Sequence, residues 1–150
     1  MKKIDLAAAP KGEGTRYPPP HDAPCRNRRW VRLGDAAGLT QFGVNIVTLD
    51  PGVWSSQRHW HSHEDEFVYV LEGELVLVTD AGEEIMRAGD GAGFKAGDRD
   101  GHHLQNRSDK PARFLVVGSR HEEDWGEYPD VDMKFLPGRG GYTRKTGEPL

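Results

Sequence analysis

The sequence has little of what several large protein classes require. Cys25 is the only cysteine among 150 residues, so no disulfide can form within the chain, and a reducing compartment is expected. No apolar run approaches the roughly 18 residues that a membrane-spanning helix needs. The stretch between Lys3 and Pro10 is too short and too interrupted for the apolar part of a signal peptide. We therefore expect a cytoplasmic protein with no membrane partner.

Positive charge and the common catalytic signatures are scarce as well. The 20 Lys and Arg residues are outnumbered by 24 Asp and Glu, and the net charge of −4 provides no basic footprint for nucleic acid. No Ser-His-Asp, Walker or dinucleotide pattern occurs, because the glycines at 89, 91 and 93 follow a turn instead of opening a helix. We expect no nucleic-acid partner.

Turn-forming residues, by contrast, are abundant. The chain has 19 Gly and 10 Pro against 35% hydrophobic residues, which suits a small β core with many turns. Short apolar runs recur every 8–12 residues or so between 41 and 118, and this spacing predicts a single-domain, all-β sandwich or barrel. The predicted strands are 30–33, 41–49, a strand carrying His59 and His61, 66–71, 75–79, 84–87, 91–94, 102–106 and 113–118, with a turn at 34–38.

The two ends differ from this middle part. Residues 1–30 lack periodicity and are rich in proline, so we interpret them as an extended N-terminal arm. Residues 31–120 would form the barrel. Residues 121–150 are acidic at first and glycine-rich later, and we expect a surface wrap that ends in a loose terminus, with a lid over the barrel mouth as the alternative.

A histidine-rich stretch contains the candidate metal-binding residues. His59 and His61 are two residues apart, and on a strand their side chains would leave the same face about 6.6 Å apart, close enough to converge on one metal ion. Glu66 opens the next predicted strand and would fold back opposite them. A further histidine comes from His102 or His103, and the shared face of 102, 104 and 106 favours His102.

These residues resemble the two motifs of the cupin superfamily. The positions that match the motif spacing are His59, His61, Glu66 and Gly73 in the first, and Gly89, Gly97, His102 and Asn106 in the second. Segments 38–45, 59–73 and 101–108 are also similar to the small bacterial cupins that are often labelled sugar-phosphate-isomerase-like. The resemblance implies a double-stranded β-helix, or jelly-roll barrel, with N- and C-terminal arms, and a homodimer.

The resemblance also implies a metal site. It assigns His59, His61, Glu66 and His102 as the ligands of a divalent transition metal, and this ligand set suits Zn, Fe, Mn or Ni without choosing among them. The alternative is that these histidines belong to a His-rich surface hairpin or that the site holds no metal. Gln57, which shares the predicted ligand face, is the candidate substrate-binding residue.

Three functions agree with such a site. The first is a metal-dependent enzyme that acts on a small polar, sugar-like or carbonyl metabolite, such as a sugar-phosphate isomerase, with Glu66 as the candidate catalytic base. The second is an Fe(II)- or Mn-dependent dioxygenase. The third is a non-catalytic sensor that binds a small molecule without turnover. The sequence leaves open whether the protein is an enzyme.

Overall fold

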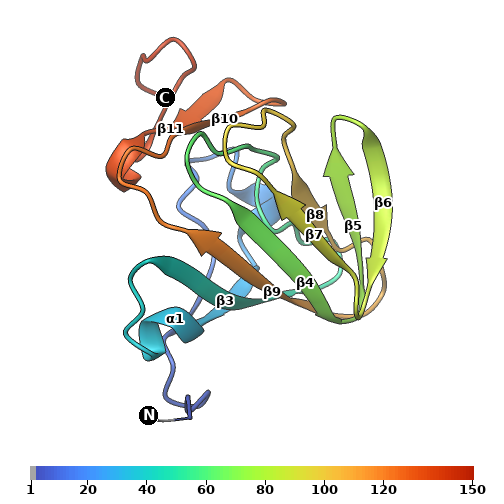
Figure 1. Ribbon diagram of the computed structural model, residues 1–150. Helices are drawn as coiled ribbons and strands as arrows, with labels where there is room; N and C mark the ends of the chain where they lie inside the picture. The colour runs from blue at the N-terminus through green and yellow to red at the C-terminus, as the bar shows by residue number, and fades with distance from the viewer. Residues whose placement is uncertain (1–2) are drawn as a thin grey trace.

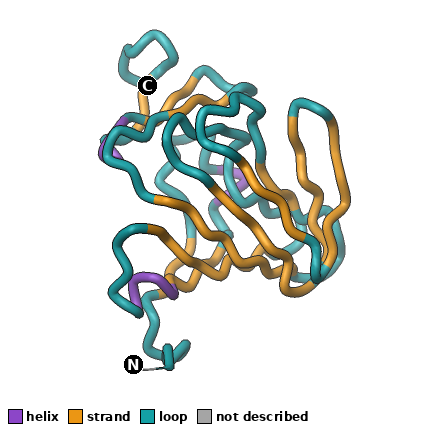
Figure 2. The backbone as a smooth tube through the Cα atoms, in the orientation of Figure 1, coloured by secondary structure: helices purple, strands orange, loops and turns teal. Residues whose placement is uncertain are grey.

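The computed structural model describes residues 3–150, and strands provide most of its regular structure (Figures 1 and 2). Helix is limited to α1 (Leu33–Ala36) and the 3₁₀ turns η1 (Ala23–Cys25) and η2 (Pro137–Arg139). The strands are β1 (Lys11–Glu13), β2 (Arg29–Arg32), β3 (Phe42–Leu49), β4 (Glu66–Glu72), β5 (Glu74–Thr79), β6 (Gly82–Arg87), β7 (Gly91–Phe94), β8 (His103–Gln105), β9 (Ala112–Ser119), β10 (Gly126–Tyr128), β11 (Met133–Phe135) and β12 (Tyr142–Thr143).

Two antiparallel sheets form the body. A six-stranded sheet has the order β1-β2-β3-β9-β4-β7, and a three-stranded sheet has the order β6-β5-β8. Figure 1 shows β5 and β6 in a separate layer from β3, β9 and β4. The expected all-β jelly roll is confirmed.

The core lies between these two sheets because each strand alternates apolar and exposed side chains. In β4, Val68 and Val70 are buried, whereas Phe67, Tyr69 and Leu71 are exposed on the other face. Both sheets contribute to the core, which consists of Val47, Leu49, Val53, Val68, Val70, Leu75, Leu77, Met86, Leu104, Ala112 and Phe114. The same alternation points Glu66, the first residue of β4, toward the interior.

The N-terminal segment packs onto this body. β1 pairs with β2 at the edge of the large sheet. An edge is the position at which a proline-rich segment can form a strand. Cys25 is fully buried, and the ring of Tyr17 packs edge-on against Tyr128, 5.4 Å between centroids. The N-terminal arm is therefore part of the folded structure, and it contacts both the large sheet and the C-terminal extension.

The C-terminal extension forms its own small sheet. β10, β11 and β12 pair antiparallel in that order. Figure 1 shows β10 and β11 across one end of the two main sheets. The backbone of the histidine stretch hydrogen-bonds to this extension, since Ser62 N donates to Trp125 O at 2.8 Å and Trp60 N donates to Glu127 O at 3.4 Å. The extension thus packs against the histidine stretch at one end of the main sheets, and the surface wrap and the lid both stay predictions.

Two local predictions differ from the structure. The turn predicted at 34–38 is partly helical, because its first three residues belong to α1. The predicted strand through His59 and His61 is a loop that forms only isolated bridges, Trp54 to Gln105 and His59 to His102. The reason is that its backbone groups are divided between β8 on one side and the C-terminal extension on the other, so no continuous ladder forms.

No helix within residues 3–150 has the length and apolar character needed to cross a membrane.

Candidate metal centre

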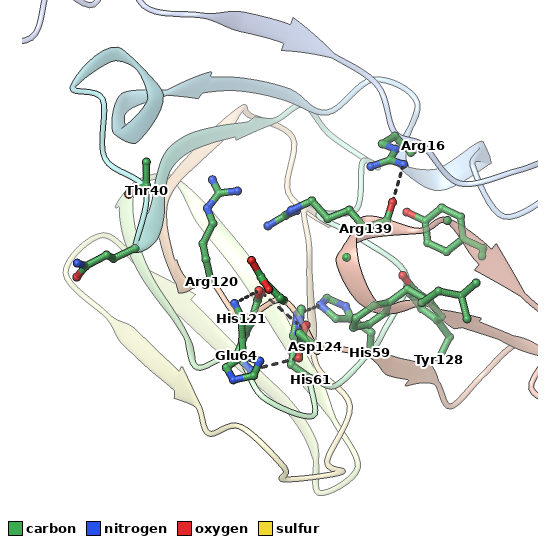
Figure 3. Close-up of a pocket in the computed structure, with 17 residues that line it drawn as sticks. Arg16, Thr40, His59, His61, Glu64, Arg120, His121, Asp124, Tyr128 and Arg139 are labelled. Carbon is green, nitrogen blue, oxygen red and sulfur yellow. Dashed lines mark hydrogen bonds and ion pairs between the residues drawn. The ribbon is translucent and has the colours of Figure 1, made fainter.

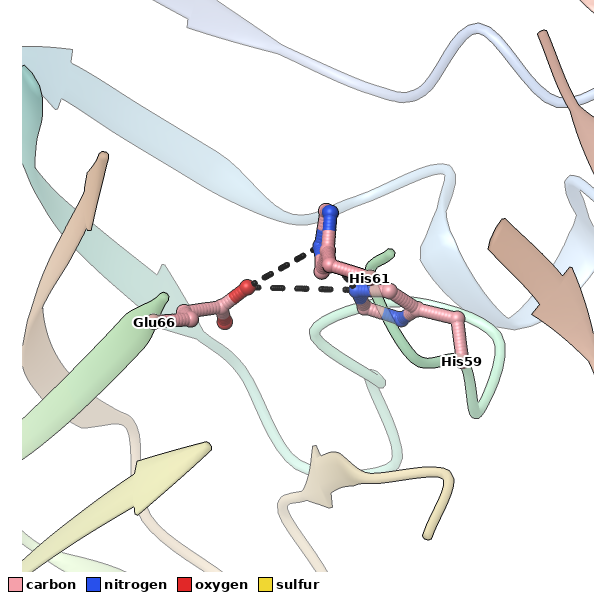
Figure 4. Close-up of side chains that lie close together, drawn as sticks. All are labelled: His59, His61 and Glu66. Carbon is pink, nitrogen blue, oxygen red and sulfur yellow. Dashed lines mark hydrogen bonds and ion pairs between the residues drawn. The ribbon is translucent and has the colours of Figure 1, made fainter. Parts of the chain in front are cut away.

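Four side chains converge at the end of the main sheets where the extension packs. His59 and His61 come from the loop between β3 and β4, Glu66 begins β4, and His102 immediately precedes β8. Glu66 Oε2 lies 3.4 Å from His61 Nε2 and 3.9 Å from His59 Nε2, and Glu66 Oε1 lies 3.7 Å from His102 Nε2. Figure 4 shows the Glu66 carboxylate facing both imidazoles.

Hydrogen bonds fix the orientation of two of the rings. Nδ1 of His59 lies 2.9 Å from the carbonyl oxygen of Gln57, and Nδ1 of His61 lies 2.7 Å from Asp124 Oδ2. Both partners accept hydrogen bonds, so each Nδ1 carries a proton, and each ring presents a lone pair at Nε2 when it is in its neutral form. These two Nε2 atoms are 3.1 Å apart. Two lone pairs at this distance repel each other unless a proton or a metal ion lies between them, and this donor set suits a divalent transition metal.

His102 adds a second observation of the same kind. Its side chain is 5% exposed, and both of its ring nitrogens are buried without a hydrogen-bond partner among the described residues. Its ring stacks on Phe94 at 3.6 Å between centroids, which holds it in place. A buried polar atom without a partner is costly, so an unpartnered Nε2 aimed at Glu66 fits a ligand that a metal would complete.

His103 points elsewhere. Its Nδ1 lies 2.9 Å from the carbonyl oxygen of Ser56, and its Nε2 lies 3.0 Å from Gln105 Nε2. Its ring packs against Trp54 and not against the other histidines. Of the two candidates that the sequence leaves open, His102 is therefore the one that lies beside Glu66.

The surroundings set the charge of each group. Burial lowers the pKa of His59 to about 4, because a charged imidazolium is poorly solvated there. Burial acts in the same direction on His61, but its hydrogen bonds to Asp124 and Glu66 outweigh it and raise the pKa to about 10. Burial disfavours the charged form of Glu66, yet the three histidines hold the pKa of this carboxyl well below its usual range. The site thus contains a carboxylate, and a proton competes with a metal at His61.

Asp124 is the main residue that sequence reasoning missed. It lies in the C-terminal extension, 63 positions from His61, and its side chain is 6% exposed. Oδ2 accepts the His61 hydrogen bond, while Oδ1 accepts from the backbone N–H groups of His63, at 2.8 Å, and Glu64, at 3.2 Å. Such a carboxylate-histidine pair orients a metal ligand. The only available signal was the acidic composition of the extension, which does not single out one residue.

A cavity of about 590 Å³ opens beside His59 and His61, two of the four donors (Figure 3). His59 and His61 form part of its floor, and the aromatic side chains of Tyr128, Phe135 and Tyr142 come from the C-terminal sheet. Its wall also holds Glu64, a second carboxylate that the sequence did not single out. Glu64 Oε1 accepts the backbone N–H of His121 at 2.9 Å, and Oε2 lies 4.0 Å from His61 Nδ1.

Gln57 lies away from this cavity. Its side chain is buried, and Nε2 donates to the carbonyl oxygen of His21 at 2.8 Å. This bond ties the histidine loop to the N-terminal segment. The predicted contact of Gln57 with a substrate stays a prediction that no contact in the structure supports.

Comparison with known proteins identifies the family. The cupin domain profile matches residues 45–118, which include all four donors. A structure from Silicibacter pomeroyi, described as a sugar phosphate isomerase of the cupin superfamily, is 50% identical, covers 99% of this chain and 96% of its own, and has a TM-score of 0.94. The chain belongs to the cupin superfamily.

Two further proteins are similar to this chain over shorter parts of its length. An Acidithiobacillus ferrooxidans structure, described as a candidate sugar phosphate isomerase, is 30% identical over 77% of this cupin and 74% of its own chain, with a TM-score of 0.70. The tetracenomycin polyketide synthase protein TcmJ of Streptomyces glaucescens is 35% identical over 81 residues, 53% of this chain. The cupin spans about half the length of this curated relative, 52%.

The comparisons also separate the common part of this cupin from its additions. The four donors lie inside the matched domain, whereas Asp124, Tyr128 and Tyr142 lie beyond residue 118. The Silicibacter pomeroyi structure nevertheless covers nearly the whole chain, so the C-terminal extension is shared with it.

Proposed function

We propose that this cupin is a metal-dependent enzyme acting on a small polar, sugar-like or carbonyl metabolite, in the manner of a sugar-phosphate isomerase. His59, His61, Glu66 and His102 would hold a divalent transition metal, of which Zn, Fe, Mn and Ni all suit the ligand set. The observation that carries the proposal is the convergence of Nε2 lone pairs of His59 and His61, 3.1 Å apart, beside a buried carboxylate.

The neighbouring proteins support the reaction class. The Silicibacter pomeroyi structure, similar over nearly the whole chain, is described as a sugar phosphate isomerase. A bound metal of this kind supplies Lewis acidity toward a carbonyl or hydroxyl oxygen. Four protein ligands leave positions free for substrate when the ion is five- or six-coordinate.

Glu64 is the residue that we assign to proton transfer. An isomerase must remove a proton from one carbon and return it to the next, and a ligand such as Glu66 is poorly placed for this task because its oxygens are engaged by the histidines. Glu64 lines the cavity, its side chain is 15% exposed, and its Oε2 accepts no hydrogen bond from residues 3–150. It can therefore accept a proton from a substrate in the cavity.

Metal content tests the ligand set. Protein purified without added metal should contain close to one equivalent by elemental analysis, and His59→Ala, His61→Ala and His102→Ala should each lose most of it. His103→Ala is the matched control, since this neighbouring histidine is equally buried but bonds to Ser56 and Gln105. Equal metal content in all five proteins would remove the site assignment.

Proton exchange tests the reaction. In D₂O, the metal-loaded protein should exchange the proton on the carbon next to the carbonyl of an aldose phosphate such as ribose 5-phosphate, followed by proton NMR. Glu64→Gln should lower the exchange rate by at least about a hundredfold, in the range typical of a lost general base, with metal content unchanged. Unaltered exchange in Glu64→Gln would remove Glu64 from this role.

We also propose a homodimer formed through the outer face of the six-stranded sheet. Paired strands align exposed or half-exposed apolar side chains there, such as Val44, Val117 and Phe67 in one row and Ile46, Leu115 and Tyr69 in the next. A contiguous apolar face of this kind is unusual on a monomer. The expected cytoplasmic location stays a prediction.

A further inference from the structure

Three arginines from distant parts of the chain line the cavity beside the candidate metal centre. Arg16 lies in the N-terminal segment, Arg120 immediately follows β9, and Arg139 lies in η2 of the C-terminal extension. Figure 3 shows the side chains of Arg120 and Arg139 entering the pocket from different sides, with Arg16 beside Arg139. The same three arginines line an adjoining cavity of about 500 Å³, which Glu66 also lines.

The charges of these arginines are poorly neutralised. Within residues 3–150, neither Arg16 nor Arg139 has a carboxylate oxygen within 4.0 Å, and the nearest one to Arg120 is Asp35 Oδ1, at 3.9 Å. Asp35 also forms an ion pair with Arg32, with 3.7 Å between Asp35 Oδ2 and Arg32 Nη1. A protein with a net charge of −4 therefore gathers three cationic side chains at one cavity, and within residues 3–150 their only ion pair is the 3.9 Å contact of Arg120 with Asp35.

The acidic residues of the same cavity are engaged elsewhere or stand apart. Asp124 bonds to His61 and to two backbone N–H groups, and Glu64 accepts the N–H of His121. Glu122 is exposed and forms no ion pair with any described residue. None of these three carboxylates forms an ion pair with Arg16, Arg120 or Arg139 among the described residues.

The backbone is arranged to present Arg139. Its φ is 58°, in the left-handed region that non-glycine residues rarely adopt, and it is the only described non-glycine residue with a positive φ. The turn is held at both sides, because Gly138 N donates to Glu122 O at 2.9 Å and Arg16 Nη2 donates to Arg139 O at 3.4 Å. Strain of this type persists only where the surrounding structure holds the backbone in place, and it is concentrated at binding and catalytic sites.

Space is reserved for Arg120 as well. A methyl group added at Gly43 would lie 3.1 Å from Arg120 Nη2, so the absence of a side chain on β3 lets the guanidinium lie against the sheet. Gly43 has an ordinary β conformation, since its φ is not positive, and its small size therefore serves the arginine and not the backbone.

We propose that Arg16, Arg120 and Arg139 form a binding subsite for the phosphate group of the substrate. This inference rests on the proposed function for the rest of the substrate, which makes the preferred ligand a phosphate monoester of a small hydroxycarbonyl compound. Guanidinium groups bind phosphate oxygens through paired hydrogen bonds. Three of them match the three terminal oxygens and double charge of a phosphate monoester, whereas a single arginine suffices for a carboxylate.

Calorimetric titration of the metal-loaded protein tests the subsite. We expect inorganic phosphate and glycerol 3-phosphate to bind, and acetate to bind at least about tenfold more weakly. Arg120→Gln and Arg139→Gln should each lower the affinity for both phosphate compounds by at least about tenfold, as expected for the loss of a charged hydrogen bond. Arg139→Lys should retain more affinity than Arg139→Gln because the charge remains.

Control variants separate this effect from general changes. Arg113→Gln removes an arginine near the other end of β9 that pairs with Glu72 outside the cavity, and it should bind phosphate like the parent. Arg139→Gly removes the side chain at a position with positive φ, so it should melt at or above the parent temperature and still bind phosphate weakly. Metal content should equal that of the parent in every arginine variant.

The outcomes that overturn the inference are distinct from failure of the proposed function. Acetate binding as tightly as phosphate, or unchanged phosphate affinity in Arg120→Gln and Arg139→Gln, would overturn the subsite. Phosphate binding that is lost in His59→Ala but kept in both arginine variants would place the anion on the metal and would overturn it too. A protein that binds phosphate esters through the arginines but exchanges no proton would contradict only the proposed isomerase.

Discussion

At the scale of single residues, the site is organised by which atom of each imidazole is already engaged. His59 and His61 use Nδ1 for hydrogen bonds and leave Nε2 free, whereas His103 uses both nitrogens. His102 uses neither of its ring nitrogens in a bond to any described residue. Which histidines can offer a lone pair to the proposed metal therefore depends on the partners of each ring and not on the number of histidines in the sequence.

Asp124→Asn tests the partner of His61. An amide that keeps its oxygen toward the backbone N–H groups of His63 and Glu64 places its NH₂ against His61 Nδ1. Nδ1 must then accept, Nε2 carries the proton, and the lone pair facing Glu66 is lost. We expect metal affinity to fall by about 10- to 100-fold, measured by competition with a chelator.

Asp132→Asn is the control for this measurement. Asp132 belongs to the same extension but is exposed and pairs with Arg144, so the variant should bind metal like the parent. An Asp124→Asn protein with the metal affinity of the parent would show that the carboxylate does not tune His61.

At the scale of elements, the C-terminal extension forms one side of the cavity beside the histidines. It contributes Asp124 as the partner of His61, Tyr128 and Tyr142 to the wall, and Arg139 to the arginine cluster. Trp125 packs on the buried Trp60, with 5.1 Å between ring centroids, and so fixes the extension to the histidine loop. Displacing this sheet should therefore affect metal binding and substrate binding together.

Gly126→Ala should displace it. A Cβ at Gly126 would overlap the carbonyl oxygen of Trp60, a backbone atom that cannot move aside, and would press on the ring of Phe135. We expect a loss of about 1–3 kcal/mol in the free energy of unfolding, as for overpacking, together with faster proteolysis within 121–150 and weaker metal binding. Gly93→Ala is the control, since no atom lies within 4 Å of its added Cβ. Equal proteolysis of the two variants would contradict this prediction.

The reactivity of the Cys25 thiol tests whether the N-terminal segment stays packed on the body. Cys25 is the last residue of η1 and is fully buried, and this burial raises the pKa of its thiol to about 11. At pH 8 the fraction of thiolate is then about a hundredfold lower than for a thiol near its usual pKa. We expect a thiol reagent to label the native protein at least about a hundredfold more slowly than the urea-unfolded protein. Rapid labelling of the native protein would mean that residues 3–30 do not stay docked.

At the scale of the whole molecule, the two faces of the six-stranded sheet have different roles. The inner face carries the core and Glu66, and the outer face exposes Phe67, Tyr69 and Leu71 from the same strand. Strand alternation produces both faces from one continuous run, so burial of the outer face requires a second chain.

Phe67→Asp tests the proposed homodimer. Phe67 is 44% exposed and lies on the apolar row with Val117, so a carboxylate there would be buried without a partner in the dimer. Sedimentation should give a dimer for the parent and a monomer for the variant at micromolar concentration. Ile85→Asp changes a somewhat more exposed residue, 54% against 44%, in β6 on the other sheet and should remain dimeric. A monomeric parent would contradict the homodimer.

Much of the fold is predictable from the sequence because alternation and turn residues are local signals. The strands through 42–49, 66–72, 74–79, 82–87 and 112–119 lie within a few residues of their expected places. The path of the histidine loop was wrong as a strand, because its hydrogen bonds go to β8 and to residues 125–127, which are remote in sequence. Alternation cannot reveal such partners.

What the sequence by itself determined was three of the donors, His59, His61 and Glu66, and the type of sheet that carries them, since their spacing and the strand pattern are properties of short segments. Only the tertiary structure decided that His102 and not His103 faces Glu66, that Asp124 holds His61, and that three arginines meet at one cavity. The physical reason is that these relations join segments separated by 36 to more than 100 positions, from Glu66 to His102 and from Arg16 to Arg139. They exist only after the two sheets and the C-terminal extension have packed together.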